Sequence, residues 1–254
     1  MEFLKICLIV CPLVFLGSFV DSVAGGGGLI TLPAYMLAGL PVHTASGTNK
    51  LVAAFGSLSA SYRYLRSGNV MIRVALLSAL GSLGGAMAGT RLALYIPEKT
   101  LEIIMMIVLP TVAIFLSVNK QLGKEHTPRM LTPGMQSITA LGIGLVIGCY
   151  DGLIGPGTGT FLIIAFSGIM GLDLLVSSGC AKVSNMASNI ASSIVWLLNG
   201  KVMFTLLIPA AICSIIGGNL GAKFAIKGGS QRIRKVMFVV LALLFAKMIY
   251  DYVF

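Results

Sequence analysis

Charged residues are scarce in this sequence. Asp, Glu, Lys and Arg make up 10% of its 254 residues, whereas a soluble domain carries about 25%. Hydrophobic residues account for 57%, above the usual value of about 45–50%. This composition excludes an ordinary soluble domain and indicates a chain surrounded mostly by lipid. At roughly 20 apolar residues per crossing, the length leaves room for about eight to ten crossing or half-crossing segments.

Acidic residues are the scarcest of the charged kinds. The chain has 8 Asp and Glu against 18 Lys and Arg, which gives a formal net charge of +10. In a soluble protein such an excess would suggest a nucleic-acid partner. Here the basic residues lie mainly in short gaps between apolar runs, where the positive-inside rule concentrates them in membrane proteins. We therefore expect a lipid bilayer around the chain and no nucleic-acid partner.

Motifs of catalysis and metal binding are also missing. The sequence contains no Walker sequence, no HExxH and no GxSxG, and its two histidines, His43 and His126, are isolated. The five cysteines lie in apolar segments without CxxC spacing, so they indicate neither a disulfide framework nor a zinc site. We interpret them as small buried hydrophobic residues. The sequence predicts no enzyme, no catalytic residues, no metal and no cofactor.

The first residues resemble a secretory signal, because Lys5 precedes an apolar run at 6–19 and small residues at 22–24 could form a cleavage site. The same pattern, an apolar stretch that ends in Asp and Gly-rich sequence, recurs at 141–159. No signal peptide can lie so deep in a chain. We therefore predict that the first apolar segment is part of the fold.

The sequence repeats itself. A shift of 132 residues places SGTNK at 46–50 on SGCAK at 178–182 without gaps, and a shift of 130 residues extends the match toward the N-terminus. The matched residues include Asp21 with Asp151, Gly25 with Gly155, Gly27 with Gly157, Ser61 with Ser193, Leu65 with Leu197, Gly68 with Gly200, Ser82 with Ser214, Gly85 with Gly217, Gly89 with Gly221 and Arg91 with Lys223. We predict two duplicated halves, 1–118 and 134–254, joined by the polar linker 119–133.

Each half contains five apolar segments. They cover 3–20, 29–40, 45–62, 70–90 and 101–118 in the first half, and 136–150, 159–170, 174–198, 202–222 and 236–250 in the second. The second segment of each half has only about a dozen residues, too few for the roughly 17–25 that a transmembrane helix needs. We expect these two segments to be half-helices or re-entrant arms.

Corresponding loops of the two halves differ in charge. In the first half the loop after the third segment is basic, with Arg63, Arg66 and Arg73, whereas in the second half the basic loop follows the fourth segment, at 223–235. The positive-inside rule then places both basic loops and the linker in the cytoplasm and both chain termini outside. This pattern indicates inverted repeats. We predict an all-α integral membrane protein of two inverted repeats, each with a broken or re-entrant helix hairpin and three transmembrane helices.

Glycine-rich sequence follows the first segment of each half, at 21–28 and 151–160. Irregular backbone at membrane depth survives only where it is buried in protein or lines a wet cavity. Each short arm begins where the glycines end, so it presents free N–H groups and the positive end of its dipole. Two inverted halves would bring both N-termini together near the midplane as a binding site for an anion. The alternative is that the glycines only allow tight helix packing.

Lys50 and Lys182 are matched basic residues inside apolar segments. An intramembrane charge costs about 2.5–3.5 kcal/mol or more and marks a functional candidate. The lysines would supply cationic donors to an anion; alternatively one pairs with an aspartate, or Lys50 extends to the membrane surface. Asp21 and Asp151 are the matching acids. Their role is either proton coupling or capping of the glycine turns and pairing with the lysines.

The candidate residues combine glycines of the two turns with polar side chains of the third segments. The candidates for substrate binding are Gly25, Gly26, Gly27, Gly28, Ser46, Thr48, Asn49, Lys50, Gly155, Gly157, Thr158, Ser178, Cys180 and Lys182, and those for proton coupling are Asp21 and Asp151. Separately, Gly85-xxx-Gly89 and Gly217-xxx-Gly221 have the small-residue spacing of closely packed helices. We predict a structural role for these two pairs.

The turn at 21–28, the Thr48-Asn49-Lys50 segment and their second copies resemble the sulfite exporter family of the TauE/SafE type, also called the sulfonate uptake permease family. The resemblance covers essentially the whole chain. It departs from the motif at Ala181, which stands where the first half has Asn49. The second half therefore cannot repeat the contribution of that amide.

The resemblance implies a carrier in the bacterial inner membrane that handles sulfite, thiosulfate-like ions, sulfoacetate or other organosulfur anions. We accordingly predict a multi-pass secondary transporter of a small organosulfur or sulfur-oxyanion that works as an exporter. The alternatives are an anion channel and an uptake permease for another small anion. The expected partners are the anionic substrate, protons and the lipid bilayer, whereas the sequence does not specify an oligomeric state.

Overall fold

The computed structural model describes residues 2–118 and 132–253, and within these ranges the chain is helical with no β-strand. The helices are α1 (Glu2–Ala24), α2 (Gly28–Leu37), α3 (Val42–Arg66), α4 (Ile72–Tyr95), α5 (Glu98–Val118), α6 (Pro133–Leu153), α7 (Thr158–Gly168), α8 (Leu174–Leu198) and α9 (Phe204–Val253). This confirms the predicted all-α class. The predicted linker, 119–133, lies outside the described residues except for its last two.

Four helices of the described chain are long and apolar enough to cross a bilayer: α1, α4, α6 and the first part of α9. Their outward faces carry exposed Leu and Ile side chains, as a surface in contact with lipid requires. The prediction of two short arms is confirmed, because α2 has 10 residues and α7 has 11, fewer than the roughly 17 that a crossing needs. α3 and α8 have 25 residues each but bury many Ser, Asn and Gly residues inside the protein.

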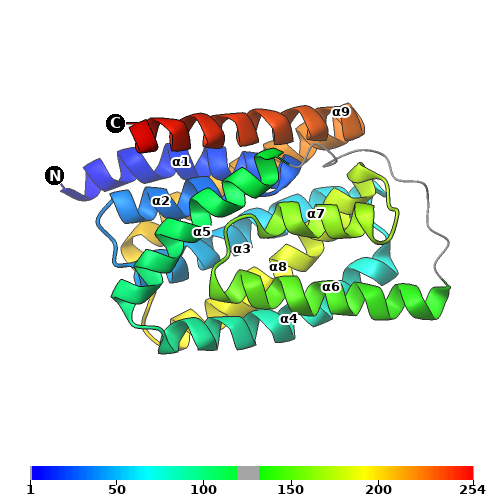
Figure 1. The fold of residues 1–254 in the computed structure, drawn as a ribbon, viewed down its shortest axis with the longest axis horizontal. Coiled ribbons are helices and arrows are strands. Elements are labelled where there is room, and N and C mark those ends of the chain that lie inside the picture. The colour runs from blue at the N-terminus through cyan, green and yellow to red at the C-terminus, as the bar shows by residue number, and fades with distance from the viewer. Residues whose placement is uncertain (1, 119–131, 254) are drawn as a thin grey trace.

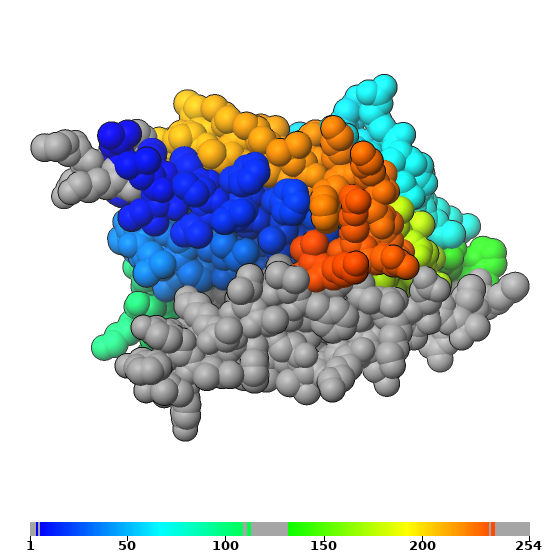
Figure 2. Space-filling view, turned by 90° about the horizontal axis from the view of Figure 1, so that it is seen from above, coloured from blue at the N-terminus to red at the C-terminus, as the bar shows by residue number. Residues whose placement is uncertain are grey.

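The two halves of the chain interlock (Figure 1). α4 packs along α6 and α1 packs along α9, so each pair takes one helix from each half. Figure 2 shows α1 in blue beside the first part of α9 in orange. α3 and α8 contact each other, and each also packs on the fourth helix of the other half, α9 and α4 respectively. These contacts correspond to one another when the two halves are exchanged, in agreement with the repeated sequence.

Glycines bring the α4–α6 and α1–α9 pairs into backbone contact. A Cβ atom added to Gly85 would overlap the carbonyl oxygen of Leu145, and one added to Gly217 would overlap that of Phe15. The two contacts correspond under the shifts that relate the halves. Only glycine permits helices to approach this closely. The predicted packing role of the two GxxxG pairs is confirmed.

We expect Gly85→Ala to destabilise the protein by about 1–3 kcal/mol, because the added methyl group pushes α4 away from α6. Gly142→Ala is the matched control. A Cβ atom at Gly142 meets nothing within 4 Å, so alanine there should stabilise α6 by about 0.5–1 kcal/mol through its helix propensity. Thermal unfolding of both variants in one detergent measures the difference. Equal midpoints would show that α4 and α6 do not need the glycine.

The predicted loop between the apolar segments at 202–222 and 236–250 corresponds to a break inside α9. Gly229 has non-helical geometry there (φ 61°, ψ −165°), so α9 consists of two helices that meet at a kink. The intervening residues are rich in Lys and Arg, which are good helix formers. The break falls at glycine because a positive φ costs least there. Because Arg is a good helix former, Arg63 and Arg66 also lie on a helix, in the last turn of α3, rather than in a loop.

Candidate functional site

Two glycine-rich turns interrupt the helices where the sequence predicts. Between α1 and α2, Gly25 and Gly26 have φ values of 76° and 80°, and between α6 and α7, Gly155 and Gly157 have φ values of 95° and 88°. These positive values are accessible to glycine and unfavourable for other residues. The glycines therefore allow the chain to turn sharply from a spanning helix into each short arm.

The two turns touch each other. A Cβ atom added to Gly25 would overlap the backbone of Gly159 and Thr160, and the Thr160 hydroxyl donates a hydrogen bond to the carbonyl oxygen of Ala24 at 3.1 Å. The N-termini of α2 and α7 therefore meet in one region. Some N–H groups of these first turns bond to the glycine turns, as Leu29 does to Gly26 and Thr158 to Gly155. Each helix end also brings a positive partial charge of roughly half an elementary charge.

A cavity of about 50 Å³ lies between these turns and the middle of α3 and α8, with room for a few water molecules. Most of its wall consists of Gly, Ser, Thr and Asn residues, and the apolar side chains that line it are Val14, Leu32, Val52, Ala53 and Ile154. The Ser, Thr and Asn side chains of this wall, with Asp21, Lys50 and Asp151, offer hydrogen-bond partners to a hydrophilic ligand.

Two ion pairs connect the halves at this cavity. Lys50 Nζ lies 2.6 Å from Asp151 Oδ1, and Lys182 Nζ pairs with Asp21 Oδ2. Each lysine therefore finds its acid in the opposite half. The pair of Lys50 and Asp151 is nearly inaccessible to solvent, whereas the Asp21 side chain keeps 20% of its surface exposed beside a fully buried Lys182. The four charges cancel, so the helix N-termini supply the remaining positive potential.

The acids have further hydrogen-bond partners. The backbone N–H of Gly27 donates to Asp21 Oδ1 at 3.3 Å, so Asp21 caps the first glycine turn while it pairs with Lys182. The Ser188 hydroxyl donates to Asp151 Oδ2 at 2.6 Å. Capping and pairing, one of the two roles that the sequence leaves open for Asp21, is therefore present. Proton coupling stays a prediction.

The structure brings most of the predicted site residues to one cavity. The candidates that line it are Asp21, Gly27, Gly28, Ser46, Asn49, Lys50, Asp151, Gly155, Gly157 and Thr158. The candidates that do not line it are Gly25, Gly26, Thr48, Ser178, Cys180 and Lys182. The glycines of this second group shape the first turn, and Lys182 reaches the site only through Asp21.

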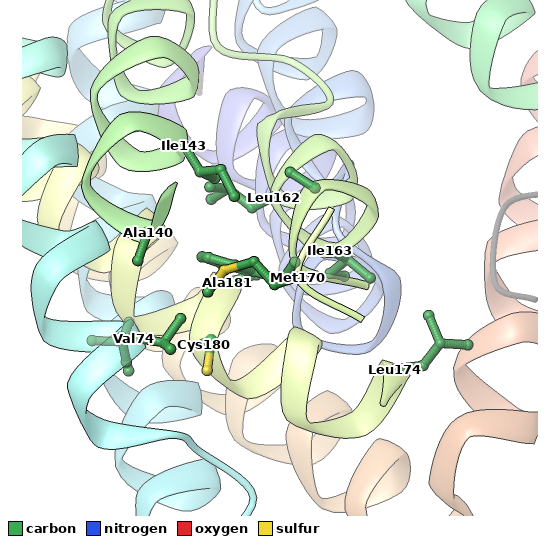
Figure 3. Packing of buried hydrophobic residues seen from close by; sticks show 13 residues of the cluster. Val74, Ala140, Ile143, Leu162, Ile163, Met170, Leu174, Cys180 and Ala181 are labelled. Carbon is green, nitrogen blue, oxygen red and sulfur yellow. The ribbon is translucent and has the colours of Figure 1, made fainter. Parts of the chain in front are cut away.

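The remaining members of the second group have other structural roles or lie elsewhere. The Thr48 hydroxyl accepts a hydrogen bond from the backbone N–H of Met203 at 2.9 Å, which holds the start of α9. Cys180 belongs to an apolar cluster with Ala181 (Figure 3). Ser178 is fully buried near the start of α8. These residues stand close to Lys50 or Lys182 in the sequence, but successive residues of a helix face different directions.

Several polar residues of the cavity wall were not predicted from the sequence. Asn185 and Asn189 on α8 and Ser57 on α3 line the cavity. The Asn189 amide donates to Asn185 Oδ1 at 3.1 Å and to the Ser57 hydroxyl at 3.3 Å, and the Asn185 amide reaches Asp21 Oδ2 at 3.5 Å. The available signal was the spacing of Lys182, Asn185 and Asn189, which places three polar residues on one face of an apolar helix.

The fold and the site define a multi-pass α-helical membrane protein of the transporter class, not an enzyme. A family model described as "Sulfite exporter TauE/SafE" matches residues 10–248. The chain belongs to this family, as the resemblance predicts.

Several bacterial relatives carry the description "probable membrane transporter protein". ORF9 of Sinorhizobium sp is 33% identical over 237 residues, which cover 93% of this chain and 90% of the relative. A protein of Haemophilus influenzae is 34% identical, with coverage of 93% and 92%. YfcA of Escherichia coli K12 is 33% identical, with coverage of 93% and 87%. No solved structure matches the chain with significant similarity.

Proposed function

We propose that this transporter exports a small organosulfur or sulfur-oxyanion, such as sulfite or sulfoacetate, through the bacterial inner membrane as a secondary carrier. The observation that carries the proposal is the meeting of two short-helix N-termini at one polar cavity. Helix N-termini bind oxyanions through their free N–H groups and their dipoles. The family description and the bacterial relatives support the class of substrate and the membrane.

The anion would compete with Asp21 for its donors. Asp21 accepts from the N–H of Gly27 and from Lys182, and an oxyanion at the N-terminus of α2 would use donors of the same kind. Two negative charges so close together are unfavourable in a site that contains little water. The anion therefore binds best when Asp21 is protonated.

Competition of this kind couples the anion to a proton that moves in the same direction, so export proceeds when the outward gradient of the anion exceeds the inward gradient of protons. Linkage requires that if protonation of Asp21 strengthens anion binding, anion binding promotes protonation of Asp21 by the same factor. Asp21 is the better placed of the two acids, because it keeps 20% of its side-chain surface exposed while Asp151 keeps 3%. We assign the proton to Asp21, with Asp151 as a fixed counterion of Lys50.

Transport by purified protein in proteoliposomes tests the proposal. Labelled sulfite should accumulate against its gradient when an inward proton gradient is imposed, and the accumulation should disappear when a proton ionophore is added. Liposomes without protein are the control. Flux that never exceeds equilibration would identify an anion channel, and no sulfite or sulfonate flux under either condition would contradict the proposed substrate class.

We also propose that the two halves are inverted in the membrane, with both chain termini outside the cytoplasm. The distribution of basic residues carries this proposal, and in Figure 1 α1 begins and α9 ends at the same end of the molecule. A reporter active only in the cytoplasm, fused after Phe254, should be inactive, whereas the same reporter inserted after Lys124 in the linker should be active. Strong activity of the fusion at Phe254 would refute the inverted arrangement.

A further inference from the structure

A second groove of about 470 Å³ opens between the end of α3 and α9. In Figure 2 the chain around this end of α3, in cyan, lies beside α9, in orange. Four basic side chains line the groove, Arg63 and Arg66 from α3 and Lys223 and Lys227 from α9, and no acidic residue lines it. It shares no lining residue with the central cavity.

The positive charge of this groove has no acidic partner in the described part of the chain. The ion pairs found between described residues involve none of the four cations. The Arg63 guanidinium donates to Asn219 Oδ1 at 2.6 Å, while its buried Nε–H has no hydrogen-bond partner among the described residues. A helix dipole favours the basic residues on the last turn of α3, and also Lys223 and Lys227 shortly before the kink of α9 at Gly229, but it gives the four cations no counterion among the described residues.

Apolar side chains lead along both helices into the groove. On α3, Leu58 lies one turn before Tyr62, and their exposed fractions are 52% and 58%. On α9, Ile212 and Ile215 lie two turns and one turn before Asn219, and they are 52% and 40% exposed. α3 and α9 are in contact here, because the Ser59 hydroxyl donates to the carbonyl oxygen of Ile215. A free anion makes no use of such a surface, whereas acyl chains do.

We propose that this groove binds the phosphate headgroup of an anionic membrane lipid, whose acyl chains lie along the apolar side chains of α3 and α9. Guanidinium groups bind phosphate oxygens through two parallel hydrogen bonds. Arg63 and Arg66 would therefore bind the phosphate directly, and the two lysines of the groove would add positive charge beside it. Basic pockets between transmembrane helices bind acidic headgroups in this way. The proposal does not depend on the identity of the transported anion.

A lipid titration tests this site. Full-length protein in a neutral detergent is titrated with dioleoyl phosphatidylglycerol, and the bound fraction is measured by native mass spectrometry. Lys223→Gln/Lys227→Gln should bind this lipid roughly 30-fold more weakly, because each lysine near an anionic lipid contributes about a fivefold factor. Arg91→Gln/Lys99→Gln removes the same charge outside the groove and should change the affinity by less than about twofold.

Two further arms identify the ligand. Lys223→Arg/Lys227→Arg keeps the charge and should retain binding, and phosphatidylcholine, which has no net charge, should bind weakly to every variant. Equal phosphatidylglycerol affinity in the glutamine double variant and its control would overturn the site. Displacement of the lipid by an equal concentration of inorganic phosphate would overturn the lipid assignment and identify a site for a free anion.

Discussion

Asp21→Asn should abolish proton-driven accumulation of sulfite in proteoliposomes while exchange of sulfite across the membrane continues. Asparagine has nearly the same shape and keeps an oxygen that can accept from the N–H of Gly27, but it cannot take up and release the coupling proton. If one proton moves with each monovalent anion, a gradient of one pH unit drives about tenfold accumulation. The variant should reach equilibration only.

Asp151→Asn is the matched control for this experiment. Asp151 is nearly inaccessible and is held by Lys50 and Ser188, so its loss should weaken the fold or the binding of substrate while the remaining transport stays coupled to protons. Full accumulation in both single variants would remove both acids from the coupling mechanism. Accumulation lost in Asp151→Asn and kept in Asp21→Asn would reverse our assignment.

The double variant Lys50→Ala/Lys182→Ala is expected to bind sulfite roughly 100-fold or more weakly, since hydrogen bonds to charged groups contribute about 1.5–3 kcal/mol each. Loss of the lysines also leaves two acids without counterions beside the site, and these would repel the anion. Calorimetric titration of the purified protein measures the affinity. An unchanged affinity would mean that the lysines only support the structure and that the site lies elsewhere.

Lys182 has two possible roles, to neutralise Asp21 and to donate hydrogen bonds to the anion, and a double variant that removes both charges separates them. Lys182→Ala alone should cost about 3–5 kcal/mol of stability, because it leaves Asp21 as an uncompensated charge. Asp21→Asn/Lys182→Gln removes both charges and should recover much of this stability. If it also recovers sulfite binding, the lysine serves only to neutralise Asp21. We expect binding to stay weak, because the cationic donor is absent.

The sequence predicted the two glycine turns, the short arms and most of the cavity wall. The internal repeat made these predictions possible. A residue such as Asp21 that recurs at a fixed offset, as Asp151, marks a position that both halves use in the same way. The exchange of partners between the halves, Lys50 with Asp151 and Lys182 with Asp21, was beyond the sequence. It depends on how the halves interlock, which a repeat offset does not specify.

The contribution of Asn185 was also beyond the sequence. The first half has Ala53 where the second has Asn185, so the comparison of repeats gave no reason to select this residue. Whether a polar residue in an apolar helix faces a cavity depends on the rotation of that helix against its neighbours. By contrast, the break of α9 at Gly229 falls inside the basic stretch where the sequence predicted a loop.

The exchanged ion pairs also limit how the charged residues of the two halves can change. Asp21 and Lys182 are 161 residues apart in the chain, yet a change of charge at one leaves the other without a counterion. Asn49 and Ala181 differ between the two halves, whereas the paired charged residues can change only together. Neither half on its own contains a complete ion pair. The site therefore needs both halves of the chain.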